Sequence, residues 1–226
     1  YLAEALFENL AHVVAQSDAD AERFRRLGAR PVTVSGNLKV DTTLPPANDD
    51  ELARLRREIG GRKVWAAVST HEGEEAAAAE VHRLLRARHP DLLTIVVPRH
   101  PERADAIAAA CAEKGLTVAR RSAGDRIAPG TDIFLGDTIG EMGLYLRLTE
   151  IAFVGRSLTG KGGQNPLEPA MLGTAVLSGR NVQNFREAYQ MLAESGGARF
   201  VRDKEVLAGA VNFLLCNEAE RRKMID

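Results

Sequence analysis

Residues 63–103, KVWAAVSTHEGEEAAAAEVHRLLRARHPDLLTIVVPRHPER, contain two short apolar runs on either side of one long helical pattern. The runs at 63–69 and 92–98 are rich in β-branched residues and are too short for buried helices, so they predict strands. The alanine-rich segment at 73–89 predicts a helix. Nearly continuous apolar strands joined by a helix are typical of parallel sheets that are covered on both faces.

The same alternation continues toward the C-terminus. Strands are predicted at 116–120, 132–136, 151–155 and 174–179, and helices at 101–114, 137–148 and 183–194, with two more from 203 onward. We therefore predict an α/β fold, a Rossmann-like doubly wound parallel sheet, from about residue 50.

The first fifty residues have a different character. HVVAQS (12–17) predicts a strand, and VTVSGNLKVD (32–41) predicts a second strand that runs into a polar turn. Ser17 with Asp20 forms a capping-box start for the helix between them, which Gly28 ends. TTLPPAND (42–49) has the composition of a linker. The chain opens with Tyr1 in a helical pattern, so we expect it to be a piece of a longer protein.

Bulk composition excludes several classes of protein. The 226 residues are 45% hydrophobic and 27% charged, which is typical of a globular protein, and the net charge of -1 argues against a nucleic-acid partner. No apolar run reaches the ~18 residues that span a bilayer. Cys111 and Cys216 and the five histidines lack metal-ligand spacing, so we predict no metal site and a reducing compartment.

Four predicted strands end in unusually polar or glycine-rich loops. In a doubly wound sheet such loops meet at the carboxyl edge, where ligands bind, so we expect one pocket there. The loops are STHEGEE (69–75), PRHPER (98–103), GDTIGEMG (136–143) and GRSLTGKGGQNPLEPA (155–170).

The first two loops suggest anion binding. Ser69 or Thr70 could cap the next helix, whose N-terminal amides would then face an anion. Arg99 follows a buried strand and is placed to bind a phosphate or carboxylate through two hydrogen bonds. His71 could be a ligand contact or an ordinary loop residue, and Arg103 could face the site or the surface of its helix.

The third loop suggests close approach of a ligand to the backbone. Asp137 or Thr138 would cap a helix whose first turn holds Gly140 and Glu141, and glycine costs about 1 kcal/mol there relative to alanine. That cost is understandable if a ring or a ribose packs against the backbone.

The glycine-rich fourth loop suggests a second anion contact. Gly160, Gly162 and Gly163 would let backbone amides point outward as an anion nest. Glu168 could accept hydrogen bonds from both vicinal ribose hydroxyls, or it could cap its own short helix. Lys161 is not followed by Ser or Thr, so the loop is not a P-loop.

Taken together, these motifs resemble the 3-deoxy-D-manno-octulosonic acid (Kdo) transferases of lipopolysaccharide synthesis, two-domain glycosyltransferases of the GT-B type. The resemblance rests on GNLKVD (36–41), STHEGEE, PRHPER, GDTIGEMG and GGQNPLEPA, which occur in the family's order and are followed by NVQNF (181–185). Arg156 stands where the family usually has a second glycine, and Gln164 where it commonly has histidine.

The resemblance implies the organisation and chemistry of the chain. Residues 1–36 would be the end of the N-terminal acceptor domain, 37–49 the interdomain linker, and 50–226 the CMP-Kdo-binding C-terminal domain. The donor would be CMP-Kdo and the acceptor a lipid A precursor, with inverting transfer at the cytoplasmic face of the inner membrane and no metal or other cofactor. The general base, the acceptor site and the membrane-associated segment would belong to the missing part, so this chain alone would bind CMP without transferring sugar.

The resemblance also implies which residues contact the nucleotide and the donor sugar. The expected nucleotide contacts are Pro98, Arg99, Ile139, Gly140, Glu141, Asn165, Pro166, Leu167 and Glu168, and the further donor contacts are Ser69, Thr70, His71, Gly162 and Gly163.

Two alternatives remain at this point. Another GT-B enzyme that uses a UDP-sugar, either a transferase or an epimerase, could use the same glycine loop and glutamate. A non-catalytic nucleotide-binding module would bind nucleotide without a partner domain. The apolar face of YLAEALF (1–7) could also pair with a second copy, which would give a dimer in a crystal.

Overall fold

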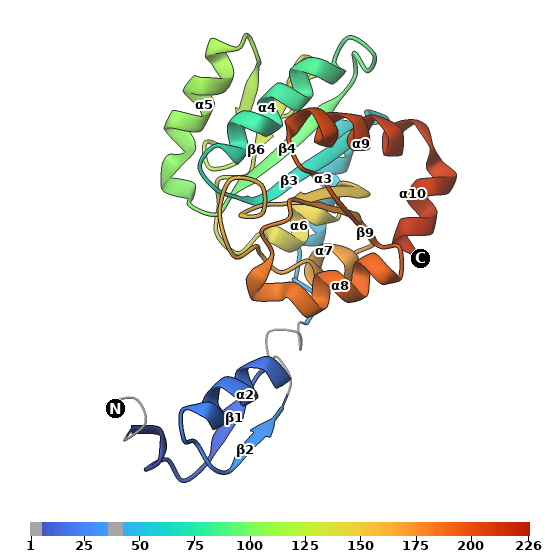
Figure 1. The fold of residues 1–226 in the computed structure, drawn as a ribbon. Coiled ribbons are helices and arrows are strands. Elements are labelled where there is room, and N and C mark those ends of the chain that lie inside the picture. The colour runs from blue at the N-terminus through green and yellow to red at the C-terminus, as the bar shows by residue number, and fades with distance from the viewer. Residues whose placement is uncertain (1–5, 36–42) are drawn as a thin grey trace. The chain divides into compact units, whose positions relative to one another are not determined.

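The computed structural model describes residues 6–35 and 43–226 (Figure 1). The chain forms two compact units, Tyr1–Thr43 and Leu44–Asp226. The boundary between the units falls within the predicted linker at 37–49.

The first unit contains a small parallel sheet. Strands β1 (Val13–Ala15) and β2 (Val32–Val34) pair in parallel, and helix α2 (Asp18–Arg26) connects them. The sequence predicted both strands and the helix, although the predicted second strand, 32–41, runs into residues 36–42, which lie outside the described residues.

The start and end of α2 follow the predicted local signals. The Ser17 hydroxyl oxygen accepts a hydrogen bond from the Asp20 amide at 3.1 Å, which satisfies one of the free amides of the first turn. Gly28 follows the helix with φ of 91°, a conformation that glycine adopts without steric cost.

The second unit is built on a seven-stranded parallel sheet, as predicted for a doubly wound fold. The strand order is β5-β6-β4-β3-β7-β8-β9, and every neighbouring pair is parallel. The strands are β3 (Val64–Thr70), β4 (Leu93–Pro98), β5 (Val118–Arg120), β6 (Ile133–Leu135), β7 (Ile151–Val154), β8 (Ala175–Ser178) and β9 (Ala198–Phe200).

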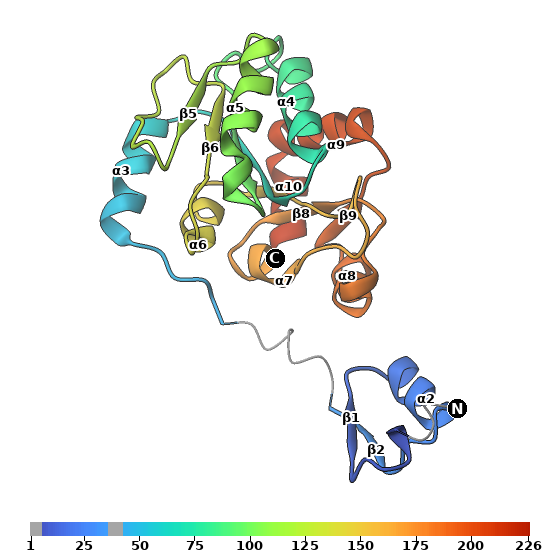
Figure 2. The same ribbon diagram turned by 90° about the vertical axis from the view of Figure 1, so that its left-hand side faces the viewer.

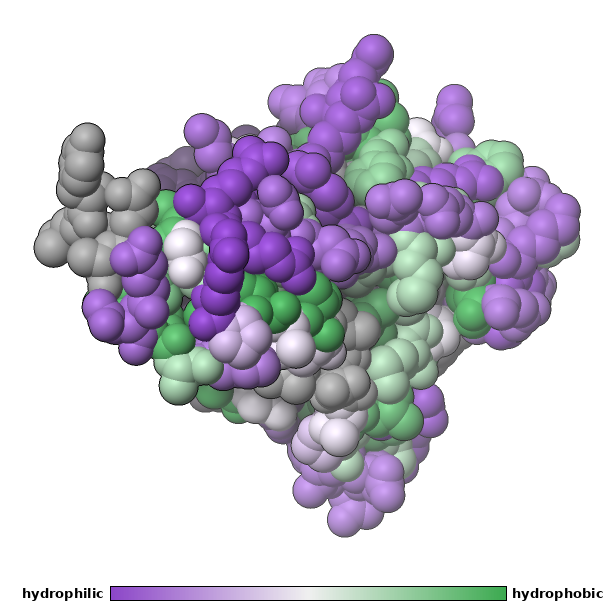
Figure 3. All heavy atoms as spheres, turned by 60° about the horizontal axis from the view of Figure 1, so that its bottom comes forward, coloured by the Kyte–Doolittle hydropathy of each residue, from purple (hydrophilic) through white to green (hydrophobic). Residues whose placement is uncertain are grey.

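Helices cover both faces of this sheet (Figure 2). One core cluster joins the sheet to α4 (Glu74–Leu85), α5 (Ala104–Glu113), α9 (Lys204–Cys216) and α10 (Glu218–Ile225). The opposite cluster joins it to α3 (Asp49–Ile59), α6 (Met142–Leu146), α7 (Leu167–Met171) and α8 (Arg186–Glu194). Two 3-10 turns, η2 (Pro101–Arg103) and η3 (Gln183–Phe185), lead into α5 and α8. The surface in Figure 3 mixes hydrophilic and hydrophobic side chains.

Three elements of this unit differ from the sequence prediction. Helix α3 and strand β9 were not predicted. The helix predicted at 137–148 begins only at Met142, because Gly140 has φ of 83° and no helix can continue through that conformation.

The strand order places a topological switch point at β3. The chain leaves β3 toward β4 and the β5–β6 edge, then returns to the other side of β3 with β7. Connections that diverge in this way leave a crevice at the carboxyl ends of the strands. The end of β3 and the segments that follow β4, β6 and β7 lie at that crevice.

A buried histidine joins the helical layer to the sheet. His82 of α4 is 1% exposed, with Nδ1 2.9 Å from the Thr94 hydroxyl and Nε2 3.1 Å from an Asp132 carboxylate oxygen. Burial lowers the pKa of His82, and the opposing effect of Asp132 does not overcome it.

We expect the free energy of unfolding to fall as the pH drops below about 6.5, the ordinary histidine pKa. The unfolded chain then takes up a proton that the folded one resists, so the contribution is complete above that pH and is lost through the window below it. Urea unfolding at pH 7.5 and 5.5 should show a smaller pH difference for His82→Gln than for the unchanged chain. Part of the pH difference should remain in the variant, because burial also lowers the pKa of His71. Equal pH differences in the two proteins would contradict this assignment.

Candidate functional site

A cavity of about 260 Å³ lies at the carboxyl edge of the large sheet. The residues around it come from the ends of β3 and β4 and from the segments that follow β4, β6 and β7, which confirms that the polar strand ends converge. They are Ser69, Val97, Pro98, Arg99, Pro101, Thr138, Ile139, Gly140, Met142, Gln164, Asn165 and Glu168.

Seven of the predicted contact residues line this cavity: Ser69, Pro98, Arg99, Ile139, Gly140, Asn165 and Glu168. Sequence reasoning missed the other lining residues. Thr138 and Gln164 had a signal, since each lies inside a quoted loop, whereas Val97 and Met142 are apolar and gave none.

Arg99 and Glu168 give the cavity one positive and one negative group. Arg99 directly follows β4, its amide donates to the Thr70 carbonyl at 2.9 Å, and its side chain is exposed. Within the described residues, no carboxylate forms an ion pair with Arg99. Its guanidinium is therefore available to an anion in the cavity.

Glu168 lies in the first turn of α7. Burial raises the pKa of its carboxyl above the ordinary range, against the opposing effects of Asn165 and of the positive charge on Arg99. It does not cap its helix: the Asn165 side-chain oxygen accepts from the Leu167 amide at 3.0 Å instead. The Glu168 carboxylate is thus a half-buried acceptor at the cavity wall.

This burial predicts that Glu168→Gln is more stable than the unchanged chain at pH 7. A raised pKa in the folded state means that ionisation of Glu168 opposes folding, a penalty that is absent below the unfolded pKa and complete above the folded one. Thermal unfolding should show a higher Tm for the variant at pH 7 and a smaller gap at pH 4. A lower Tm for the variant at pH 7 would show that ionised Glu168 is stabilising.

Ile139 projects from the loop after β6. Its side chain is 88% exposed, although it is large and apolar. Beside it, Gly140 has φ of 83°, and nothing lies within 4 Å of the position that a side chain would occupy. The rim of the cavity therefore presents an apolar side chain next to bare backbone, a surface that a flat ring could contact.

Glu141 was predicted to contact the nucleotide, but it does not line the cavity. Its carboxylate accepts two hydrogen bonds from Arg121, at 3.0 and 2.7 Å, which lower the pKa of Glu141. Arg121 also bonds Glu51 of α3 at 2.6 Å. Glu141 therefore connects the loop after β6 to helix α3 through Arg121.

The predicted helix caps around the site are wrong. Helix α4 begins after Gly73, which has φ of 88°, and neither Ser69 nor Thr70 caps it. Thr70 is fully buried at the end of β3. Asp137 accepts from the Ser122 amide and hydroxyl at 2.8 and 2.6 Å and does not cap α6.

The predicted anion nest of Gly160, Gly162 and Gly163 is wrong at Gly162 and Gly163, whose amides are bonded within the protein. The Gly162 amide donates to the Gln183 side chain and the Gly163 amide to the Arg156 carbonyl, each at 3.0 Å. Both glycines are buried, and an added Cβ would lie 2.5 Å from Asn184 or 2.9 Å from Val182. They are required for close packing of two loops. Pro166 and Leu167 are likewise buried and do not line the cavity.

His71 does not line the cavity, but it contacts Gln164, which does. Its Nε2 is 3.2 Å from the Gln164 amide nitrogen, so Gln164 donates and the His71 proton resides on Nδ1. The rings of His71 and His100 meet edge to face at 5.5 Å. Arg103 pairs with Glu75 at 2.9 Å and does not line the cavity.

Two further properties bear on function. The described residues contain no group of three His, Cys, Asp or Glu side chains that could hold a metal ion. Among the helices of these described residues, none combines the length and the apolar composition that a membrane span requires.

Comparison with known proteins gives consistent matches along the chain. A family model described as 3-deoxy-D-manno-octulosonic-acid transferase (kdotransferase) matches residues 1–42. The 3-deoxy-D-manno-octulosonic acid transferase of Bordetella pertussis is 38% identical over 100% of this chain and 54% of its own length. That of Haemophilus influenzae is 33% identical over 98% of this chain and 53% of its own length. The chain thus spans about half the length of the curated relatives it matches.

Two solved structures have a fold similar to that of this chain. The C-terminal CMP-Kdo binding domain of WaaA from Acinetobacter baumannii matches with a TM-score of 0.74 and 29% identity, covering 78% of this chain and 93% of that domain. Anabaena Alr3699/HepE, solved in complex with UDP, matches with a TM-score of 0.60 at 12% identity over 99% of this chain and 59% of that one, which shows a shared fold alone. The fold is that of the C-terminal domain of GT-B glycosyltransferases.

Proposed function

Because this chain belongs to the 3-deoxy-D-manno-octulosonic acid transferase family, we propose that residues 44–226 bind CMP-Kdo for transfer of Kdo to a lipid A precursor. The observation that carries the proposal is the cavity at the switch point, with Arg99 and Glu168 in its wall. The likeness to a domain described as CMP-Kdo binding supports the choice of donor.

In this proposal, each charged group of the cavity binds a different part of the nucleotide. The Arg99 guanidinium binds the phosphate through charge-assisted hydrogen bonds. The Glu168 carboxylate accepts hydrogen bonds from the ribose hydroxyls. Ile139 and the backbone of Gly140 contact the cytosine ring.

The transfer step then uses Arg99 to stabilise the leaving group. An acceptor hydroxyl loses its proton to a general base, and its oxygen forms a bond to the anomeric carbon of Kdo as the bond from that carbon to the phosphate oxygen breaks. The electron pair of that bond leaves with CMP, whose phosphate gains negative charge next to Arg99. We propose that this stabilisation requires no metal ion.

The remaining parts of the reaction are assigned to the rest of the enzyme. We propose that the general base and the lipid acceptor site belong to the N-terminal domain, since catalysis in a two-domain glycosyltransferase takes place between the domains. A lipid A precursor as acceptor would place the full enzyme at the cytoplasmic face of the bacterial inner membrane.

Calorimetric titration of this chain with CMP, UMP and ADP tests the donor assignment. We expect CMP to bind at least tenfold more tightly than the other two nucleotides. Tighter binding of UMP would favour a UDP-sugar enzyme of the same fold, and equal binding of all three would contradict a cytidylyl site.

A further inference from the structure

Glu74, the first residue of α4, is a buried carboxylate that holds two loops at once. Glu74 is only 1% exposed to solvent. One carboxylate oxygen accepts from the His71 amide at 2.9 Å and the Arg156 amide at 2.6 Å. The other accepts from the Ser157 and Leu158 amides at 3.0 and 2.9 Å. Four backbone donors from two loops therefore converge on one side chain.

These two loops follow neighbouring strands, β3 and β7, on either side of the switch point. A left-handed residue that is not glycine precedes or begins each loop: Ser69, near the end of β3, has φ of 52°, and Arg156, after β7, has φ of 56°. Such residues cost on the order of 1 kcal/mol or more each and persist only where the surroundings hold them. For Arg156 the Glu74 carboxylate supplies that restraint, because it accepts a hydrogen bond from the Arg156 amide.

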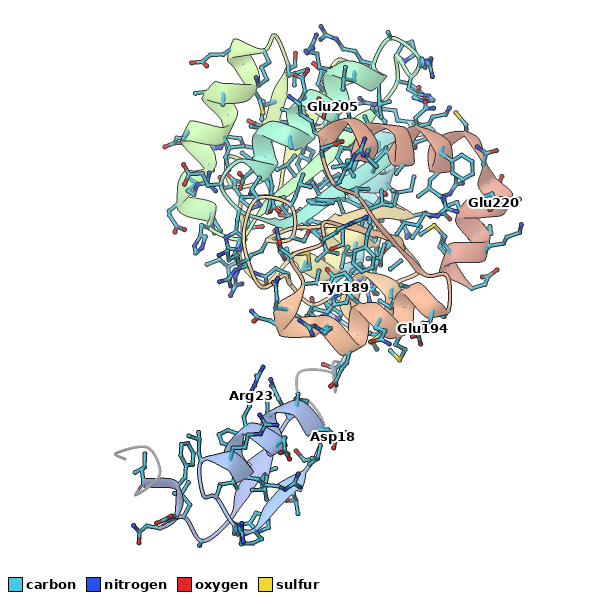
Figure 4. The ribbon with its side chains drawn as sticks, in the orientation of Figure 1. Asp18, Arg23, Tyr189, Glu194, Glu205 and Glu220 are labelled. Atoms are coloured by element: carbon cyan, nitrogen blue, oxygen red, sulfur yellow. The ribbon has the colours of Figure 1, made fainter. Side chains whose placement is uncertain are left out.

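The restraint extends from Glu74 to the cavity wall. The Arg156 carbonyl accepts from the Gly163 amide at 3.0 Å, and the next residue is Gln164, which lines the cavity. The Gln164 carbonyl accepts from the hydroxyl of Tyr189 on α8, labelled in Figure 4, at 3.2 Å. The segment that carries Gln164 and Asn165 is thus fastened on one side through Glu74 and on the other through Tyr189.

We propose that Glu74 is a positioning residue for the nucleotide site: its carboxylate takes the place of an anion among the amides of 156–158 and holds the cavity wall in the geometry that binds the donor. This inference rests on the proposed function. It also means that the donor phosphate cannot use those amides and must be bound by side chains such as Arg99.

Glu74→Gln tests the role with almost no change in size. Each Glu74 oxygen accepts two amides, so either orientation of the glutamine places its NH₂ group opposite two N–H donors. We expect CMP to bind about tenfold more weakly or worse, a change equal to the loss of one or two such hydrogen bonds. Amide hydrogen exchange in residues 155–165 should become at least about tenfold faster, because the amides lose their acceptor.

Glu75→Gln is the matched control. Glu75 is the next residue of α4 and is also buried, but it pairs with Arg103 at 2.9 Å and bonds the Thr70 side chain, and it accepts none of the amides of 156–158. Both variants replace a buried carboxylate with a neutral amide, whereas only Glu74→Gln should change CMP affinity and exchange in 155–165. Should Glu74→Gln fail to fold, Glu74→Asp keeps the charge and moves it back from the amides by one methylene.

The outcomes separate this inference from the proposed function. Unchanged CMP affinity in Glu74→Gln, or equal weakening in Glu74→Gln and Glu75→Gln, would overturn the positioning role. If the unchanged chain does not bind CMP, the donor assignment fails, and hydrogen exchange in 155–165 still decides whether Glu74 holds the loop.

Discussion

Arg99→Ala is expected to weaken CMP binding by about 10- to 100-fold, the loss associated with hydrogen bonds to a charged group. The side chain is exposed at the cavity, so its removal should leave the fold and the Tm nearly unchanged. Calorimetric titration of the unchanged chain and the variant at one ionic strength measures the effect, because a charged contact of this kind weakens with added salt.

Arg202→Ala is the control for the loss of positive charge. Arg202 is an exposed arginine that pairs with Asp203 at 3.0 Å and does not line the cavity. Its removal should leave CMP affinity within about twofold. Equal losses in the two variants would indicate long-range attraction, and no loss in Arg99→Ala would remove Arg99 from the phosphate site.

Gly155→Ala is expected to damage both the fold and the site. Gly155 is buried directly after β7, and an added Cβ would lie 2.5 Å from the Ser69 carbonyl oxygen and 2.7 Å from a Glu74 oxygen. The first of these neighbours is backbone and cannot turn away. We expect the free energy of unfolding to fall by about 3 kcal/mol, the upper part of the range for overpacking, and CMP affinity to fall with it.

Gly209→Ala provides the comparison. Gly209 lies in the middle of α9, and no atom lies within 4 Å of the added Cβ. Alanine should stabilise that helix by about 1 kcal/mol without changing CMP affinity. Urea unfolding of both variants measures the contrast, and a stable Gly155→Ala with normal affinity would show that the ends of β3 and β7 move apart freely.

The sheet could be predicted because its central strands are buried on both faces. Such strands appear as short apolar runs, and each predicted run in 50–226 coincides with an observed strand to within two residues. Strand β9 was not predicted because it has three residues, of which only Ala198 is buried. Helix α3 had a signal in Asn48, Leu52, Leu55 and Ile59, but the prolines before it made the region resemble a linker.

The site could be predicted only in part, for a physical reason. Parallel strands bring their carboxyl ends to one edge, so Arg99, Ile139 and Glu168 could be expected to meet. The partners of individual backbone amides depend on contacts between distant segments. An acidic residue such as Glu74 at the start of a helix is already explained by the helix dipole, and its bond to the Arg156 amide spans 82 residues of sequence. The same contact occupies amides that local glycine content would assign to a ligand.

The most direct test of the account is a crystal structure of this chain with CMP. We predict that the nucleotide occupies the cavity at the carboxyl edge, with its phosphate on the Arg99 guanidinium, its ribose hydroxyls on the Glu168 carboxylate, and the amides of 156–158 still bonded to Glu74. CMP bound at the amino ends of β3 and β7, or a phosphate seated on the amides of 156–158 in place of Glu74, would contradict it.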